Sequence, residues 1–203
     1  MMRALLLTPA LLLGGCISLL PEQPPPPRIY VLEAGEVERA EAPALAAVIG
    51  VAAPSGERSL LGGDLVWREG DELIVIDRSQ WSARAETALQ SMLVETLARQ
   101  GRFRAATPAG EARGDYEIRW EVLDFEVSAA TMNARFAADV KLVSLPGRAV
   151  IAQRHILTEA ALTERTSSAA ANALARAARE GSARIGDFAA EAAAQASAAS
   201  ISR

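Results

Sequence analysis

The chain has few of the side chains that most catalytic and metal sites require. Its 203 residues include one cysteine, Cys16, one histidine, His155, and one lysine, Lys141. A single cysteine excludes a disulfide framework, and one histidine with one cysteine cannot supply the usual ligands of a zinc site. We therefore expect neither a metal nor a cofactor.

A strong charge excess is also absent, since the balance is only mildly acidic. The chain has 21 basic residues (Lys and Arg) and 25 acidic residues (Asp and Glu), and no basic run stands out. Without a basic patch the chain lacks the electrostatic footprint of nucleic-acid binding, so nucleic acid is not an expected partner. Residues 54–58 contain Pro-Ser-Gly but lack the second glycine and the lysine of a phosphate-binding loop.

His155 is the remaining candidate for acid–base catalysis. It follows Arg154 in a stretch with the pattern of a strand, and no Gly-x-Ser-x-Gly nucleophile motif accompanies it. We expect a histidine on a strand surface rather than a catalytic base, and a protein that is not an enzyme.

The beginning of the chain has the order of an export signal. Arg3 precedes an apolar run, residues 4–13, which only Thr8 and Pro9 interrupt. A helix needs about 20 apolar residues to cross a bilayer, so this run is typical of a signal peptide. Leu13-Gly14-Gly15-Cys16 resembles the bacterial lipobox, and the resemblance implies cleavage after residue 15 and a lipid on the Cys16 sulfur. The alternative is a soluble secreted protein whose cysteine is incidental.

Residues 16–27 form the expected tether between lipid and domain. Ile17 stands where an aspartate in such lipoproteins commonly means retention in the inner membrane, so the resemblance implies the outer membrane. Four consecutive prolines, residues 24–27, favour an extended spacer of about 3.1 Å per residue. A proline-rich ligand for an aromatic groove is the alternative.

Residues 28–203 are long enough to form one domain that buries about 70% of its unfolded surface. Apolar and alternating patterns indicate its strands. We expect them at residues 29–32, 45–53, 65–68, 73–76, 115–127, 136–143 and 149–157. We expect the two strands around Gly70 to form a hairpin and the last three to form an antiparallel meander. The alternation slips after Val122, which indicates a bulge or a strand end.

Two helices are expected. The first runs from Ser82, which can cap its N-terminus, to a C-cap at Gly101. The second covers the alanine-rich residues 166–203, with Gly181 and Gly186 marking a kink or a close approach to the sheet. Its apolar stripe consists of Leu174, Ala178, Ile185, Phe188 and Ala192.

Three tryptophans, Trp67, Trp81 and Trp120, are notable because only 4% of the residues are aromatic. Core packing is the first expectation for each, and contact with a partner protein is the alternative, because tryptophan is common at binding hot spots.

Several of these features coincide in one known family. They are the lipobox, the proline tether, residues 30–32, residues 65–68, Trp81 before the amphipathic helix, Leu93 and Leu97 before residues 101–103, residues 116–125 and the terminal helix. Together they resemble the ABC-type transport auxiliary lipoprotein family. The resemblance implies an α/β domain, with a mixed β-sheet and two main helices packed on it, similar to anticodon-binding-like folds.

The same resemblance implies a partner and a non-catalytic task. Such proteins are outer-membrane partners of mammalian-cell-entry (MCE) lipid transporters, as in the Pqi system, so we expect docking to an MCE-domain protein. Two other classes stay open, a lipid-anchored hydrolase with an unrecognised serine and a lipoprotein that regulates cell-wall synthesis. The transported lipid, its direction and the number of copies, including a homo-oligomer, also stay open.

Overall fold

The structure is a computed structural model that describes residues 25–201. Within this range the chain forms one mixed sheet of nine strands with helices packed on it, so the expected α/β class is confirmed. The two main helices are α2 (Ala85–Gln100) and α3 (Ser167–Ile201). A third, α1 (Arg58–Leu61), is a single turn that the sequence patterns did not predict.

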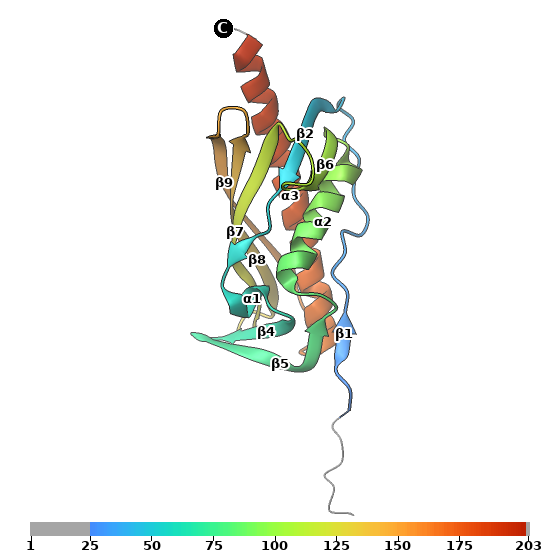
Figure 1. Ribbon diagram of the computed structural model, residues 1–203. Helices are drawn as coiled ribbons and strands as arrows, with labels where there is room; N and C mark the ends of the chain where they lie inside the picture. The colour runs from blue at the N-terminus through green and yellow to red at the C-terminus, as the bar shows by residue number, and fades with distance from the viewer. Residues whose placement is uncertain (1–24, 202–203) are drawn as a thin grey trace, which may run out of the picture.

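The sheet is organised around one long central strand. The strands are β1 (Arg28–Tyr30), β2 (Leu45–Val51), β3 (Ser55–Gly56), β4 (Asp64–Glu69), β5 (Glu72–Trp81), β6 (Phe103–Pro108), β7 (Tyr116–Ser128), β8 (Asn133–Ser144) and β9 (Ala149–Ala161). One edge of β7 pairs antiparallel with β8, and its other edge is shared by the parallel strands β2, β3 and β4 in succession. As a result β4 and β5 cross one end of the molecule, whereas β7, β8 and β9 run along its length (Figure 1).

The predicted antiparallel meander is confirmed as β7, β8 and β9. Of the two alternatives predicted after Val122, the bulge is confirmed and the strand end is not, since β7 continues to Ser128 and the β7–β8 register shifts between Val122 and Asp124. Leu123 lies in this shift and is 39% exposed. The extra residue lets Phe125 and Val127 return to the buried side of the strand, where both belong to the core.

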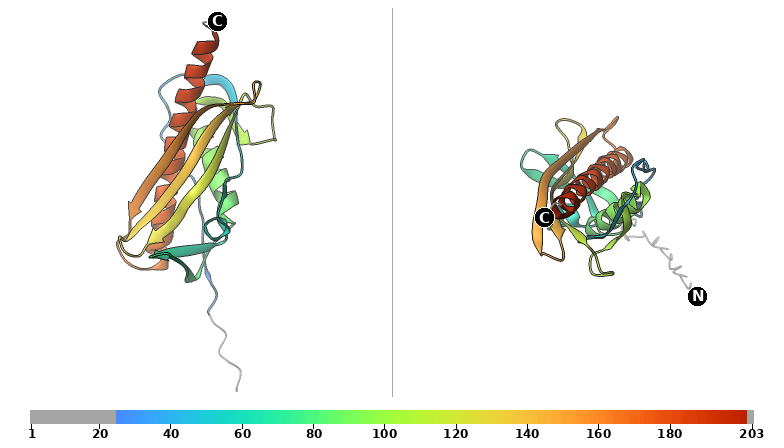
Figure 2. Two further views of the ribbon diagram at one scale, coloured as in Figure 1. Left: turned by 90° about the vertical axis from the view of Figure 1, so that its left-hand side faces the viewer. Right: turned by 90° about the horizontal axis from the view of Figure 1, so that it is seen from above.

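The inner side of the meander is covered by α3, with α2 beside it (Figure 2). The predicted stripe of α3 faces this core: all five of its residues are buried, namely Leu174, Ala178, Ile185, Phe188 and Ala192. Alanines dominate the remaining contact surface, which lets the helix axis approach the sheet closely.

Gly181 marks a close approach of α3 to the sheet. The helix continues through this position, so the prediction of close approach is confirmed and no break in the helix occurs. A methyl group at Gly181 would lie 2.4 Å from Cδ1 and Cε1 of Phe136 on β8. At Gly186 the neighbour is the other helix, because a methyl group there would lie 2.1 Å from Oε1 of Gln100 on α2.

Replacing Gly181 with alanine should therefore destabilise the domain, although alanine is the better helix former. The helix gains about 1 kcal/mol, but overpacking against the buried Phe136 ring costs about 1–3 kcal/mol. Urea unfolding should show a net loss of about 1 kcal/mol. Asn172→Ala, on the exposed side of the same helix, is the control and should be neutral or slightly stabilising. A gain in stability for Gly181→Ala would contradict the packing described here.

The predicted start of the first long helix was wrong. α2 begins at Ala85 with Arg84 at the N-cap position and no side-chain cap, so Ser82 does not cap it. The Ser82 N–H instead donates to the Tyr30 carbonyl at 2.7 Å, because the chain at this point still follows the edge of β5. The Ala85 N–H donates to the Gly62 carbonyl at 2.7 Å, which satisfies the first turn from outside the helix.

The predicted end of α2 is confirmed. Gly101 adopts a left-handed conformation with φ of 66°, and its N–H donates to the Leu97 carbonyl at 3.3 Å. This is the conformation that favours glycine at a helix C-terminus, and it turns the chain directly into β6.

Candidate functional site

The lipid-anchoring site predicted at Cys16 lies outside the described residues, as do residues 16–24 of the tether. The described chain starts at Pro25 and is exposed up to β1. β1 then pairs in parallel with the end of β5, Arg28 opposite Ser79 and Tyr30 opposite Trp81. The tether therefore joins the domain at the end that β4 and β5 cross, opposite the C-terminal end of α3 (Figure 1).

The three tryptophans belong to the hydrophobic core, with 7%, 5% and 4% of Trp67, Trp81 and Trp120 exposed. Trp81 stacks on Phe125 with ring centroids 5.8 Å apart. The ring centroids of Trp120 and Phe136 are 6.4 Å apart. The indole N–H of Trp120 donates to the Ala52 carbonyl at 2.8 Å. The structure thus satisfies the first expectation, core packing, and a direct role of the indoles in partner binding stays a prediction.

Trp67 takes no part in these ring contacts, and an arginine covers it instead. It sits on β4 beneath the Arg165 guanidinium, whose carbon is 5.2 Å from the ring centroid. Arg165 also pairs with Glu69 at the end of β4. A cation over a tryptophan face is an attractive contact, so Arg165 shields this ring from solvent.

An ion pair fixes β4 to the central strand. The Arg68 Nε donates to Glu126 Oε1, and Nη2 donates to Oε2 at 2.7 Å. The Glu126 side chain on β7 is only 5% exposed, and its hydrogen bond and charge raise the pKa of the Arg68 guanidinium above its usual value. Removing one partner of such a pair leaves a buried charge unpaired, so this contact holds the β4–β5 hairpin in place.

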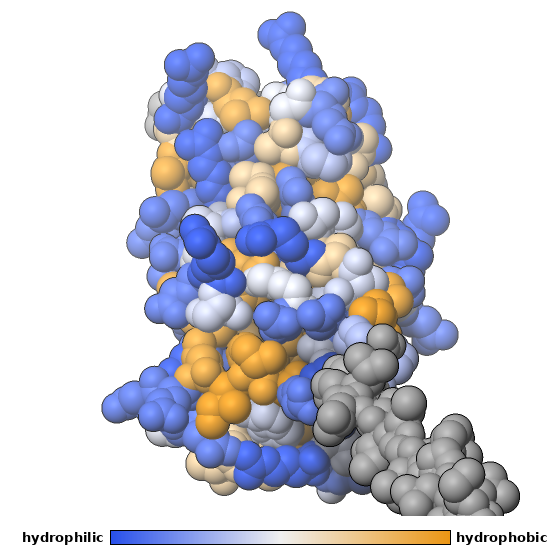
Figure 3. Space-filling model, turned by 60° about the horizontal axis from the view of Figure 1, so that its bottom comes forward, coloured by the Kyte–Doolittle hydropathy of each residue, from blue (hydrophilic) through white to orange (hydrophobic). Residues whose placement is uncertain are grey.

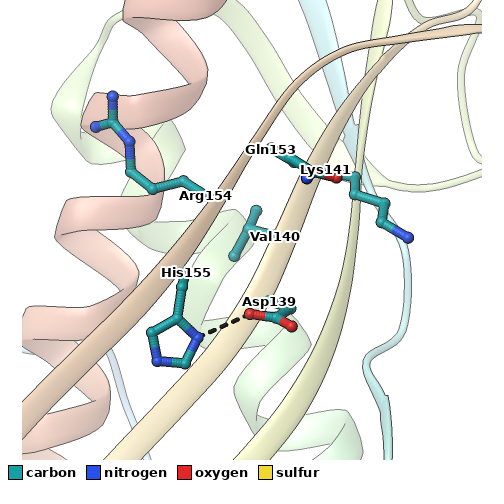
Figure 4. A pocket seen from close by; sticks show the side chains of 6 residues that line it. All are labelled: Asp139, Val140, Lys141, Gln153, Arg154 and His155. Carbon is teal, nitrogen blue, oxygen red and sulfur yellow. Dashed lines mark hydrogen bonds and ion pairs between the residues drawn. The ribbon is translucent and has the colours of Figure 1, made fainter.

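His155 lies on the solvent side of β9, as the strand-surface interpretation predicts. Its Nδ1 is 2.7 Å from the Asp139 Oδ1 on β8, and about half of each side chain is exposed. The two residues line a shallow hollow of about 220 Å³ together with Val140, Lys141, Gln153 and Arg154 (Figure 4). Arg154 is directed toward α3, where it pairs with Glu191 at 3.3 Å and lies over the Phe188 ring.

The His155–Asp139 pair supplies two members of a catalytic triad, the base and the carboxylate, but no nucleophile. A histidine held by a carboxylate can act as a general base when a serine or cysteine lies within hydrogen-bond reach of its other nitrogen. None of the six residues that line the hollow is a serine, threonine or cysteine. The arrangement can hold a polar group, but the lining of the hollow lacks a side chain that would attack a substrate.

A larger hollow of about 420 Å³ lies between residues 34–42, α2 and α3. Its charges are of both signs and partly paired within the domain: Arg102 contacts Asp187 at 2.6 Å, and Arg179 donates to the Glu33 carbonyl at 2.8 Å. Such a surface attracts neither anions nor cations strongly.

Residues 25–201 contain neither a cluster of metal ligands nor a helix suited to crossing a bilayer. No three of their histidine, cysteine, aspartate and glutamate side chains cluster as metal ligands would. None of the helices in this range combines the length and the apolar character that crossing a bilayer requires.

The sequence analysis missed the apolar side chains at the tether end of the domain. Ile74 and Val75 on β5 are 40% and 55% exposed. A signal was present, because residues 73–76 are apolar at every position, whereas a strand with one solvent face should alternate.

Comparison with known proteins gives a family and a fold. Protein XCC0632 from Xanthomonas campestris, assigned to the family DUF330, is 22% identical with a TM-score of 0.78, over 84% of this chain and 98% of that chain. A second solved structure, of an uncharacterized protein, is 14% identical with a TM-score of 0.65, over 81% and 99%. At these identities the likeness shows the fold alone.

No curated protein matches the chain with significance. A family model does match, over residues 30–186, and its description is "ABC-type transport auxiliary lipoprotein component". The match begins at the last residue of β1 and ends within α3, so it covers most of the described domain.

Proposed function

Because the chain belongs to the family of ABC-type transport auxiliary lipoprotein components, we propose that it anchors to the outer membrane through Cys16 and docks an MCE-type lipid transporter. In this proposal residues 1–15 are the signal peptide, residues 16–27 the lipidated cysteine and tether, and residues 28–203 the docking domain. The domain faces the periplasm and acts without catalysis, as an adaptor for the periplasmic assembly of the transporter.

The observation that carries the proposal is the family match over residues 30–186. The lipobox at residues 13–16 supports it independently, because it lies ahead of the matched segment and agrees with the word lipoprotein in the family description. Ile17 supports the outer membrane over the inner one.

The arrangement of the domain suits an adaptor. The tether joins one end, and the C-terminal end of α3 and the turn between β8 and β9 lie at the other (Figure 1). A domain tethered in this way presents its far end to a periplasmic partner. We propose that this far end, rather than the hollow beside His155, contacts the transporter.

The experiment is purification of the acylated protein from its own membranes after chemical cross-linking, with mass spectrometry of what accompanies it. We expect a permease, an ATPase and an MCE-domain subunit. Cys16→Ala, processed in parallel, is the control and should lose these proteins. Recovery of a peptidoglycan synthase without an MCE protein would overturn the proposal and favour the cell-wall alternative.

The hydrolase alternative is tested by His155→Ala. The side chain is half exposed and pairs with Asp139 at the surface, so the free energy of unfolding should change by less than about 0.5 kcal/mol. We expect the variant to restore the envelope barrier of a deletion strain as well as wild type does, measured as growth in the presence of detergent. A deletion phenotype that His155→Ala fails to rescue, with the protein folded and exported, would favour an enzyme.

A further inference from the structure

The end of the domain that carries the tether also carries exposed apolar side chains. Seven large apolar side chains of the described residues are exposed, and four of them belong to β1, to the residue after it or to β5. They are Ile29, Val31, Ile74 and Val75, with exposed fractions of 56%, 57%, 40% and 55%. Soluble surfaces do expose single apolar residues, but a concentration at one end indicates a contact.

The exposure of two consecutive side chains, Ile74 and Val75, is unusual for a strand at a protein surface. They are neighbours in β5, so their side chains point to opposite faces of the strand. Both are exposed because the β4–β5 hairpin projects from the body of the domain at this point (Figure 1). Apolar side chains gather in one patch near this end when it is turned forward (Figure 3).

The charges around the hairpin are mixed. Arg28 and Arg78 are close to Asp77, whereas the tip of the hairpin is acidic, with Asp71 in the turn between Glu69 and Glu72. No excess of basic side chains is available to attract anionic headgroups. A contact made by this end would therefore depend on apolar burial in an uncharged or zwitterionic surface and not on attraction between charges.

The tether brings a bilayer within reach of this end. Residues 16–27 would span about 37 Å as a polyproline-type helix and at most about 43 Å when fully extended. They join the domain at β1, which pairs with β5 in the same part of the sheet. A surface held so close has a high effective concentration, so even a weak apolar contact is populated.

We propose that the β4–β5 hairpin, through Ile74 and Val75, rests in the headgroup region of the phospholipid bilayer that holds the lipidated Cys16. The inference rests on the proposed anchor and adds to it a fixed orientation of the domain. With the hairpin on the membrane, the C-terminal end of α3 points away from it, toward a periplasmic partner. The ion pair between Arg68 and Glu126 keeps the hairpin rigid enough to set this orientation.

The test uses the full acylated protein in phosphatidylcholine vesicles at less than one molecule per vesicle. Because the sulfur of acylated Cys16 is a thioether, Val75→Cys introduces the one free thiol, which is labelled with an environment-sensitive fluorophore. Val150→Cys is the matched control: Val150 is 56% exposed, as Val75 is 55% exposed, but it lies beside the β8–β9 turn at the other end. Nitroxide-labelled phospholipid serves as the quencher.

We expect nitroxide lipid to quench the fluorophore at position 75 severalfold more than at position 150, with a blue-shifted emission at position 75. With the fluorophore on Ile74→Cys instead, adding Val75→Asp should remove the quenching while the protein still floats with the vesicles. Persistence of quenching in that variant would contradict an apolar contact.

Three results would overturn the proposal. Equal quenching at positions 75 and 150, with the protein floating, would leave the anchor intact and exclude the orientation. A blue shift at position 75 that needs high protein density and occurs without nitroxide quenching would mean that a second copy covers the hairpin. Failure of the acylated protein to float would remove the anchor and the orientation together.

Discussion

Replacing Cys16 with alanine should abolish labelling of the protein by radioactive palmitate, and the protein should disappear from the outer-membrane fraction. The physical reason is the additive burial of acyl chains. Each buried methylene contributes about 0.8 kcal/mol, so three chains contribute on the order of tens of kcal/mol, whereas one chain alone gives marginal binding. None of the helices of residues 25–201 could span the bilayer in their place.

The matched control for this variant is Ile17→Asp, which keeps the cysteine and changes only its neighbour. It should retain the palmitate label and move the protein to the inner-membrane fraction. Labelling of the Cys16→Ala variant at the wild-type level would show that another residue carries the lipid, and the anchor would then lie elsewhere.

Truncating Phe136 to alanine should cost about 4 kcal/mol of unfolding free energy, as expected for a large aromatic removed from a tight core. Phe136 is fully buried on β8, and its ring contacts Trp120 and Phe125 at centroid distances of 6.4 Å each. Gly181 of α3 lies directly against the same ring. The ring therefore joins the meander to the long helix, and its loss leaves a cavity at their interface.

Urea unfolding measures this cost, with an unchanged slope indicating that the variant still unfolds in one transition. Val150→Ala, which trims a side chain that is 56% exposed, is the control and should change stability by less than about 0.5 kcal/mol. A loss of less than about 1 kcal/mol for Phe136→Ala would contradict the packing of α3 on β8.

The two core variants should also couple. The cost predicted for Gly181→Ala comes from the Phe136 ring, so in the Phe136→Ala background the added methyl should be tolerated or stabilising. A double-mutant cycle measures this coupling. An identical cost of Gly181→Ala in both backgrounds would show that the strain has another origin.

The long elements could be predicted from sequence because their periodicity is sustained. The stripe of α3 repeats over five turns or more, and β7 alternates over enough residues for its bulge after Val122 to be visible as a change of phase. The short elements β3, α1 and β6 could not be predicted, since two to six residues with few large apolar side chains carry no measurable period.

Other features depend on tertiary structure. The capping role expected of Ser82 was wrong because the chain at Ser82 still pairs with Tyr30, and α2 begins only at Ala85. Tyr30 lies 52 positions earlier in the chain, and its proximity follows from the β1–β5 pairing. Likewise Asp139 faces His155 because the β8–β9 register places them opposite each other, and the sequence does not specify that register to a single residue.

The measurement that tests the central claim most directly is the intact mass of the mature protein isolated from its native membranes. We predict a chain that begins at Cys16, with a mass increased by a diacylglyceryl group on the sulfur and an acyl group on the new N-terminus. An unmodified chain, or one that begins at any other residue, would contradict the anchor, and with it the proposed orientation and docking role.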